Sequence, residues 1–119
     1  MRKAFALVTA FAAMMSISSA AIAAPDGKNR KVKVENLSSQ SVHYLYASPV
    51  TSNTWEEDLL GQGTIPAGTS KVANIDNGTT ECYYDLKIKM ANGREFVQRR
   101  VNVCAVSKWV IGVSGNSVQ

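Results

Sequence analysis

The most constraining feature of this chain is the stretch "CYYDLKIKM", residues 82–90, which is followed at once by Ala91, Asn92 and Gly93. Every second side chain in it is apolar, and a period of two is typical of a β-strand that buries one face. Asn-Gly directly after such a strand is a strong hairpin signal. The sequence therefore predicts a strand over 82–90 and a return strand over 94–104. The residues on the predicted buried face are Cys82, Tyr84, Leu86, Ile88 and Met90.

The register of this hairpin decides how the two cysteines meet. A two-residue turn at 92–93 places Cys82 opposite Val103, so Cys104 is one residue out of place for a cross-strand disulfide. We favour this register, with a β-bulge near Asn102 or Val103 that realigns the cysteines. A three-residue turn pairs the cysteines directly but sets Leu86 against Arg100 and Ile88 against Gln98. In a further alternative, Cys104 has left the hairpin and bridges to the opposite sheet.

The N-terminus has the order of a secretory signal peptide. Arg2 and Lys3 precede an uncharged run over residues 4–25, and Ala21-Ile22-Ala23 supplies a small-x-small cleavage site. We predict cleavage after Ala23, with cleavage one residue later as the second choice. The competing interpretation is a retained membrane anchor, because the run is nearly long enough to span a bilayer. Its alanine- and serine-rich composition favours a cleaved signal, which leaves no membrane anchor in the mature form.

Export changes which residues matter for the working protein. Loss of residues 1–23 leaves a single predicted domain, 24–119, and lowers the formal net charge from +4 to +2. Localisation is then periplasmic or secreted, where an isolated pair of cysteines most simply forms a disulfide. A Cys82–Cys104 bridge closes a loop that is worth ~3 kcal/mol in the loop-entropy model. We interpret the bridge as structural.

The remainder of the mature chain is a series of short strands separated by turn signals. Short, evenly spaced strands with almost no helical pattern are typical of a β-sandwich or small barrel. We therefore predict an all-β fold, a small antiparallel β-sandwich of about seven strands with one disulfide. Residues 114–119 are expected to fray. The other predicted strands cover 31–36, 42–47, 64–65, 71–75 and 107–113.

One stretch, 54–60, departs from this β pattern. Thr54 and Glu57 have the spacing of a capping box, and Gly61 stands where a helix would end in a left-handed residue. The sequence predicts one or two helical turns here. Trp55 and Leu59 would then share a face, and we expect them to close the open end of the sandwich.

The same region holds the candidate interaction surface. Exposed aromatic residues among charges are typical of protein-binding patches, and the candidate contacts are Tyr44, Tyr46, Trp55, Glu56, Glu57 and Asp58. Three adjacent acids on a helical turn point in different directions, so we predict no metal site. We also predict no cofactor. The basic residues lie at 28–33 and 87–100 without an aromatic platform interleaved in the way that nucleic-acid binding needs, so no nucleic acid is expected.

Catalytic signals are weak. The one histidine, His43, lies within a predicted strand, and both cysteines are committed to the bridge. Nucleophilic catalysis needs a nucleophile beside an oriented base, and no such motif occurs in the sequence. We predict that the protein is not an enzyme.

The pattern "LYASPVTSNTWEEDLLG", followed by "CYYDL" and a second cysteine, resembles a group of small exported bacterial proteins. Members of this group share L-Y-x-S-P-x-x-S-x-x-W-x-x-D-L-L-G and C-x-Y-D-[IL]. The resemblance covers roughly residues 32–111, and departs from the group at Glu56, where glycine is frequent. It implies a periplasmic β-sandwich and no assigned activity.

Two functional hypotheses follow. The first is a non-catalytic exported binding module for an unknown protein or envelope component, with its surface around residues 48–61. The second is a small inhibitor of a secreted hydrolase, a protease or a lysozyme, for which residues 48–54 supply the long loop.

Overall fold

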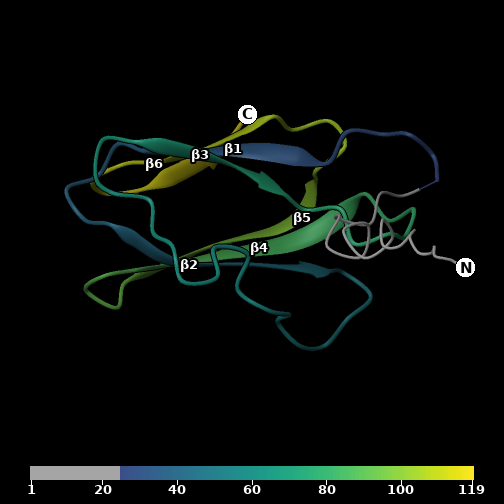
Figure 1. The fold of residues 1–119 in the computed structure, drawn as a ribbon, viewed down its shortest axis with the longest axis horizontal. Coiled ribbons are helices and arrows are strands. Elements are labelled where there is room, and N and C mark those ends of the chain that lie inside the picture. The colour runs from purple at the N-terminus through teal and green to yellow at the C-terminus, as the bar shows by residue number, and fades with distance from the viewer. Residues whose placement is uncertain (1–24) are drawn as a thin grey trace, which may run out of the picture.

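The computed structural model describes residues 25–119, which form a β-sandwich of seven strands in two sheets. Figure 1 shows the two sheets as stacked layers. The predicted all-β class, the strand number and the disulfide are confirmed. The predicted signal peptide and its cleavage site lie outside the described residues. The strands are β1 (Lys31–Asn36), β2 (Val42–Pro49), β3 (Ser70–Asn74), β4 (Tyr83–Met90), β5 (Glu95–Asn102), β6 (Lys108–Ile111) and β7 (Asn116–Val118).

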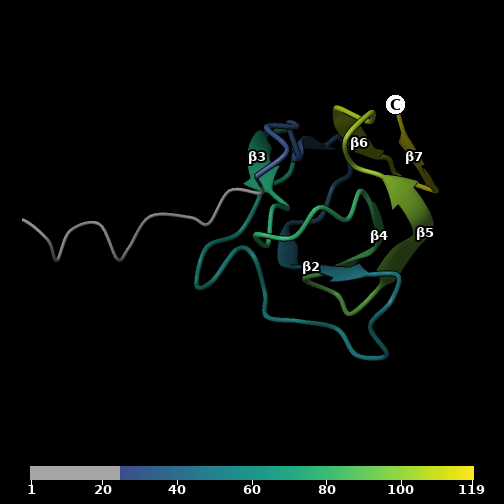
Figure 2. The ribbon, with the colours of Figure 1, turned by 90° about the vertical axis from the view of Figure 1, so that its right-hand side faces the viewer.

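The strand order makes the sandwich mixed rather than purely antiparallel. One sheet has the order β3-β1-β6-β7 and the other β2-β4-β5. Every pairing is antiparallel except that of β1 with β6, which is parallel. Figure 2 shows that β3 and β2 lie on one side of the sandwich, with β7 and β5 on the other. On the β5–β7 side, the Gln98 side-chain amide donates to Asn116 Oδ1 at 2.7 Å and ties the two sheets together.

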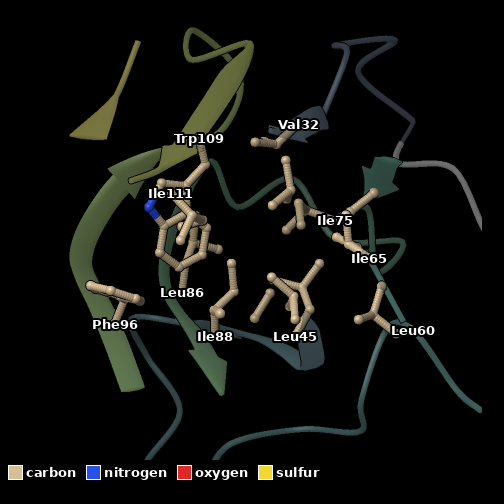
Figure 3. Packing of buried hydrophobic residues seen from close by; sticks show 14 of the residues in the cluster. Val32, Leu45, Leu60, Ile65, Ile75, Leu86, Ile88, Phe96, Trp109 and Ile111 are labelled. Atoms are coloured by element: carbon tan, nitrogen blue, oxygen red, sulfur yellow. The ribbon is translucent and has the colours of Figure 1, made fainter. Parts of the chain in front are cut away.

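The core lies between the two layers and takes alternate residues from each strand. Trp109 and Ile111 of β6 face Leu86 and Ile88 of β4, and all four are fully buried (Figure 3). The Trp109 indole nitrogen donates to Asn116 Oδ1 at 2.7 Å, so its polar atom is satisfied inside the core. The strict alternation of β4 is confirmed, since its inward side chains are buried from Tyr84 to Met90.

The hairpin between β4 and β5 differs from the favoured register. Met90 and Arg94 close a three-residue turn over 91–93, in which the Met90 amide donates to the Arg94 carbonyl at 2.8 Å. Gly93 takes a φ of 87°, the left-handed position that such turns need. The register therefore begins one residue away from the two-residue turn that we predicted.

The bulge also lies elsewhere than expected. Asp85 opposes both Arg99 and Arg100, and Arg100 has a φ of 51°. Asp85 Oδ1 accepts from the Arg100 amide at 2.9 Å, so one carboxylate stabilises the extra residue. This bulge restores the predicted pairing of Tyr84 with Val101. The bulge therefore lies before Asn102, whereas we predicted it near Asn102 or Val103.

The disulfide forms just beyond the end of the hairpin. Val103 donates to the Cys82 carbonyl, and the chain then turns so that Cys104 reaches Cys82 with a Cα–Cα distance of 5.4 Å. Asn102 makes this turn, because its Oδ1 accepts from the Cys104 amide at 3.1 Å and its carbonyl accepts from Ala105. A turn, and not a bulge near 102–103, therefore brings the cysteines together.

The C-terminal residues are ordered in a strand, contrary to the predicted fraying. β7 pairs with β6, and the Gln119 amide donates to the Lys108 carbonyl at 2.8 Å. Asn116 explains the order, because its side chain accepts from both Trp109 and Gln98. No helix among residues 25–119 is long and apolar enough to cross a membrane.

Candidate functional site

The loop after β2 contains no helical turn. Residues 54–58 are irregular and a turn covers 59–62, so the predicted helix and capping box are wrong. The Thr54 carbonyl instead accepts from the Ser48 hydroxyl at 2.8 Å, which holds the loop against the end of β2. Gly61 does take a left-handed φ of 59°, but within this turn and not at the end of a helix.

Asp58 explains why the loop does not coil. Its Oδ1 accepts from the Leu45 amide at 2.9 Å and from the Leu60 amide at 3.0 Å, while the Leu59 amide donates to the Leu45 carbonyl at 2.8 Å. The loop therefore pairs with the free edge of β2 and satisfies edge groups that would otherwise be exposed. Asp58 therefore has a structural role in this loop.

Leu60 is the residue of this loop that closes the core. It is 6% exposed and lies in the hydrophobic cluster beside Ile65 and Ile75 (Figure 3). Leu59 is 37% exposed and Trp55 is half-buried. The prediction that Trp55 and Leu59 close the sandwich is wrong, because without a helix these two side chains do not share a face.

Aromatic and basic side chains alternate across the outer face of the β2-β4-β5 sheet. The register pairs Tyr44 with Lys89 and Tyr46 with Lys87. The two tyrosine rings are stacked, with 6.1 Å between centroids and 5° between planes. Lys89 Nζ lies 6.0 Å from the Tyr44 centroid, and Lys87 Nζ lies 5.2 Å from that of Tyr46. Each ring therefore has a cation within cation–π distance.

Trp55 extends this arrangement from the loop. Its ring has Lys87 Nζ at 4.9 Å and the Arg99 guanidinium at 5.5 Å from the centroid. Arg99 also forms an ion pair with Asp85, Nη1 to Oδ2 at 3.2 Å. We name the set Tyr44, Tyr46, Trp55, Lys87, Lys89 and Arg99 the outer aromatic surface.

A small pocket of about 130 Å³ lies at the Trp55 end of this surface, between the loop and β5. Its walls are mostly polar. Ser48, Asn53 and Thr54 form one side, and Asp85 and Arg99 form the other. The pocket offers hydrogen-bond donors and acceptors beside an indole ring, the combination that positions a polar group of a partner.

Glu56 and Glu57 are exposed and line a different cavity, between the two sheets, together with Tyr84. The six predicted contacts therefore separate. Three aromatic residues lie on the outer face, Asp58 is structural, and the two glutamates border the inter-sheet cavity.

The pKa of the Tyr46 hydroxyl is raised by its burial and by the nearby charge of Asp58.

Sequence reasoning missed Lys87, Lys89 and Arg99 as part of the surface. The prediction that no aromatic platform interleaves with the basic residues considered only their order along the chain, whereas in space β2 supplies the rings and β4 the cations. The signal available in the sequence was the polar face of residues 82–90, which carries Lys87 and Lys89. Using it required the register between β2 and β4, which includes a bulge between Val42 and Tyr44.

The histidine and the two cysteines, residue types that often act in catalysis or bind metals, lie as follows. His43 is exposed at the β2 bulge, with its ring 6.5 Å from that of Tyr44. Both cysteines are in the disulfide. Within residues 25–119, no group of three or more histidine, cysteine or acidic residues is placed to hold a metal ion.

No protein-family model, curated protein or solved structure matches this chain. The resemblance to small exported bacterial proteins therefore stays a prediction from the sequence.

Proposed function

We propose that the protein is an exported, non-catalytic binding domain, and that its outer aromatic surface holds an acidic surface of a protein partner in the cell envelope. Export is supported by the signal-like N-terminus together with the disulfide in a small domain. The proposal includes no enzymatic activity.

The observation that carries the proposal is the set of partly exposed aromatic rings flanked by cations on an open sheet face. Tyr44 is 41% exposed, and Lys87 and Lys89 are not ion-paired with any residue of the described chain. Tyrosine, tryptophan and arginine are the residues most enriched among energetic hot spots of protein interfaces. Cations held by ring faces are positioned to meet carboxylates of a partner without rearranging.

The test is capture of partners from an envelope fraction by the exported chain, with two charge-reversal variants. Lys87→Glu lies within the surface, whereas Lys71→Glu lies on exposed β3 and changes the net charge equally. We expect Lys87→Glu and Trp55→Ala to reduce capture of one acidic protein about tenfold, as loss of one hot spot does. Lys71→Glu should leave capture unchanged.

Salt and competitors define the partner further. Capture should weaken as the ionic strength rises from about 0.05 M to about 0.5 M, because the contacts are electrostatic and exposed. Equal loss with both lysine variants would show non-specific charge attraction and contradict the proposal. Competition by a single-stranded oligonucleotide would overturn the expectation of no nucleic acid, and would replace the protein partner.

Inhibition of a secreted hydrolase is the second candidate, favoured by the projection of the loop after β2. Figures 1 and 2 both show this loop standing away from the two layers. It is stiffened from within, because the Ser52 amide donates to the Pro49 carbonyl at 2.8 Å and Ser48 holds Thr54. A rigid projecting loop is the preorganised form that inhibitors use.

Stoichiometric loss of activity of one protease or lysozyme at micromolar protein would support this second candidate. Full activity across a panel of both enzyme classes would eliminate it, without bearing on the capture experiment.

A further inference from the structure

A cavity on the β2–β3 side of the sandwich has acidic and apolar walls. It has a volume of about 370 Å³ and is lined by Ala47, Glu56, Glu57, Leu59, Ile75, Asp76, Asn77 and Tyr84. Its size falls in the range of sites that hold small molecules or single side chains. The outer aromatic surface contributes none of these residues.

The position follows from the topology. β2 and β3 are both terminal strands of their sheets, so the layers are not joined on this side by a strand (Figure 2). Leu60 and Ile65 close part of the gap. The cavity occupies the remainder, beyond the end of β3, where Ile75 and Ala47 of β2 both line it.

Tyr84 supplies an observation independent of the acids. The residue is 1% exposed and lines the cavity, yet its hydroxyl has no hydrogen-bond partner among the residues that the structure describes. Burial raises the pKa of the Tyr84 hydroxyl, and the nearby Thr79 side chain partly offsets that rise. The two side chains are nevertheless not in hydrogen-bond geometry. A buried unpaired hydroxyl is costly, so this one is placed to bond to an occupant.

The charges around the cavity select the sign of that occupant. Glu56, Glu57 and Asp76 are its charged walls, and Asp76 also accepts from the Gly78 amide at 3.2 Å. Arg30 is a buried cation whose guanidinium is bonded to Asp26 at 2.8 Å and to the Glu81 carbonyl, and its charge also acts on Asp76 and Tyr84. Glu56 and Glu57 form no ion pair with a residue that the structure describes, so the field at their end of the cavity favours a positive group. The apolar walls, formed by Ala47, Leu59 and Ile75, favour a hydrocarbon stem behind it.

We propose that this cavity binds an ammonium or guanidinium group carried on an aliphatic stem, with the stem between Ala47 and Ile75 and the cation toward Glu56 and Glu57. Such a group is supplied either by a lysine or arginine side chain of a peptide or by a free amine. The Tyr84 hydroxyl then accepts a hydrogen bond from the cation. The site is separate from the surface of the proposed function, and either can fail alone.

The experiment is a titration of the isotope-labelled, disulfide-bonded protein, followed by amide chemical shifts. The probes are agmatine, a four-carbon chain with a guanidinium at one end and an ammonium at the other, and n-butanol, a neutral molecule of the same chain length. We expect saturable shifts with agmatine at millimolar concentration, confined to residues 47, 56–59, 75–77 and 84. Butanol should bind at least about tenfold more weakly, because it lacks the charge.

Matched variants test the two halves of the site. Glu57→Gln should weaken agmatine binding about threefold, as loss of one partly exposed ion pair does, and Glu95→Gln on β5 should not. Tyr84→Phe should weaken binding and keep or raise the melting temperature of the free protein, because it removes an unpaired hydroxyl. Tyr83→Phe, on the exposed face, is its control.

The outcomes distinguish a peptide side chain from a free amine as the source of the cation, and they include results that would contradict the proposal. Tighter binding of a blocked Gly-Arg-Gly peptide than of agmatine assigns the site to a basic side chain, and the reverse order assigns it to a free amine. Equal binding of agmatine and butanol, shifts elsewhere, or a Tyr84→Phe protein that melts well below wild type would overturn the proposal.

Discussion

At the scale of single residues, Asp58 shows how one carboxylate replaces several backbone partners. It accepts from the amides of Leu45 and Leu60 and so joins the loop to the edge of β2. In the sequence it is one of three adjacent acids, and nothing in its neighbours distinguishes it from Glu56 and Glu57. Only the strand edge beside it gives it a different role.

Asp58→Ala is expected to lower the free energy of unfolding by about 1–3 kcal/mol, because two amides lose their acceptor. Asp58→Asn keeps an oxygen in place and should retain most of the stability. Urea denaturation of both variants, followed by circular dichroism, measures the difference. Glu57→Ala, which removes an exposed acid from the same loop, should be nearly neutral, and an equal loss in all three would contradict the assignment.

A second residue-scale prediction concerns Asp26 and the buried Arg30. Arg30 donates Nη1 to Oδ1 at 3.0 Å and Nη2 to Oδ2 at 2.8 Å, and this pairing holds the Asp26 pKa far below its usual range. A carboxyl with a lowered folded-state pKa stabilises the protein above its unfolded pKa of about 3.9, and the contribution is lost as the pH falls toward the folded value.

Calorimetry of wild type and Asp26→Asn between pH 7 and pH 2 checks this linkage. The melting temperature of the variant should be lower near neutral pH, and the gap should narrow as the pH falls below about 4. A gap that stays constant to the lowest pH would show that the charge of Asp26 contributes nothing.

At the scale of elements, the β4–β5 hairpin is held by its turn and by its bulge. The turn needs Gly93 at a φ of 87°, and the bulge is held by the Asp85 carboxylate. The turn shifts the register by one residue over Leu86 to Lys89, and the bulge restores the predicted register at Tyr84. Because side chains alternate, that shift decides which residues of β5 face the core.

Gly93→Ala should lower the free energy of unfolding by about 1 kcal/mol, because alanine is strained in the left-handed region. Gly115→Ala is the matched control, since Gly115 does not have a positive φ and a Cβ there meets nothing within 4 Å. Chemical denaturation of the two variants gives the comparison. Equal destabilisation would mean that the turn tolerates a side chain.

At the scale of the whole molecule, stability depends on how a small sandwich closes its two sides. Gln98 and Asn116 join the sheets beside β5, whereas the other side is closed by loop residues and contains the cavity. The disulfide ties the segment before β4 to the turn after β5, over a sequence separation of 22 residues.

Replacing both cysteines by alanine should lower the free energy of unfolding by ~3 kcal/mol, the value for a loop of this length. Urea denaturation with fluorescence detection reports it, since Trp109 is fully buried and moves into water on unfolding. Reduction of the wild-type protein with dithiothreitol is the control and should reproduce the shift. An unchanged midpoint would show that the bridge is not a stability element.

The sequence by itself determined the all-β class, the strands β1 to β6, the buried face of 84–90 and the disulfide pair, whereas the predicted strand at 64–65 is only an isolated bridge and β7 was predicted to fray. These depend on local periodicity, on turn residues and on there being only two cysteines. It determined neither the hairpin register nor the fate of residues 54–61, where a capping-box pattern competes with the free edge of β2. Only the tertiary structure decided those, and it also decided that tyrosines and lysines about forty residues apart form one surface. The physical reason is that pairing between distant strands sets which side chains become neighbours, and that information is not present in any local stretch of the chain.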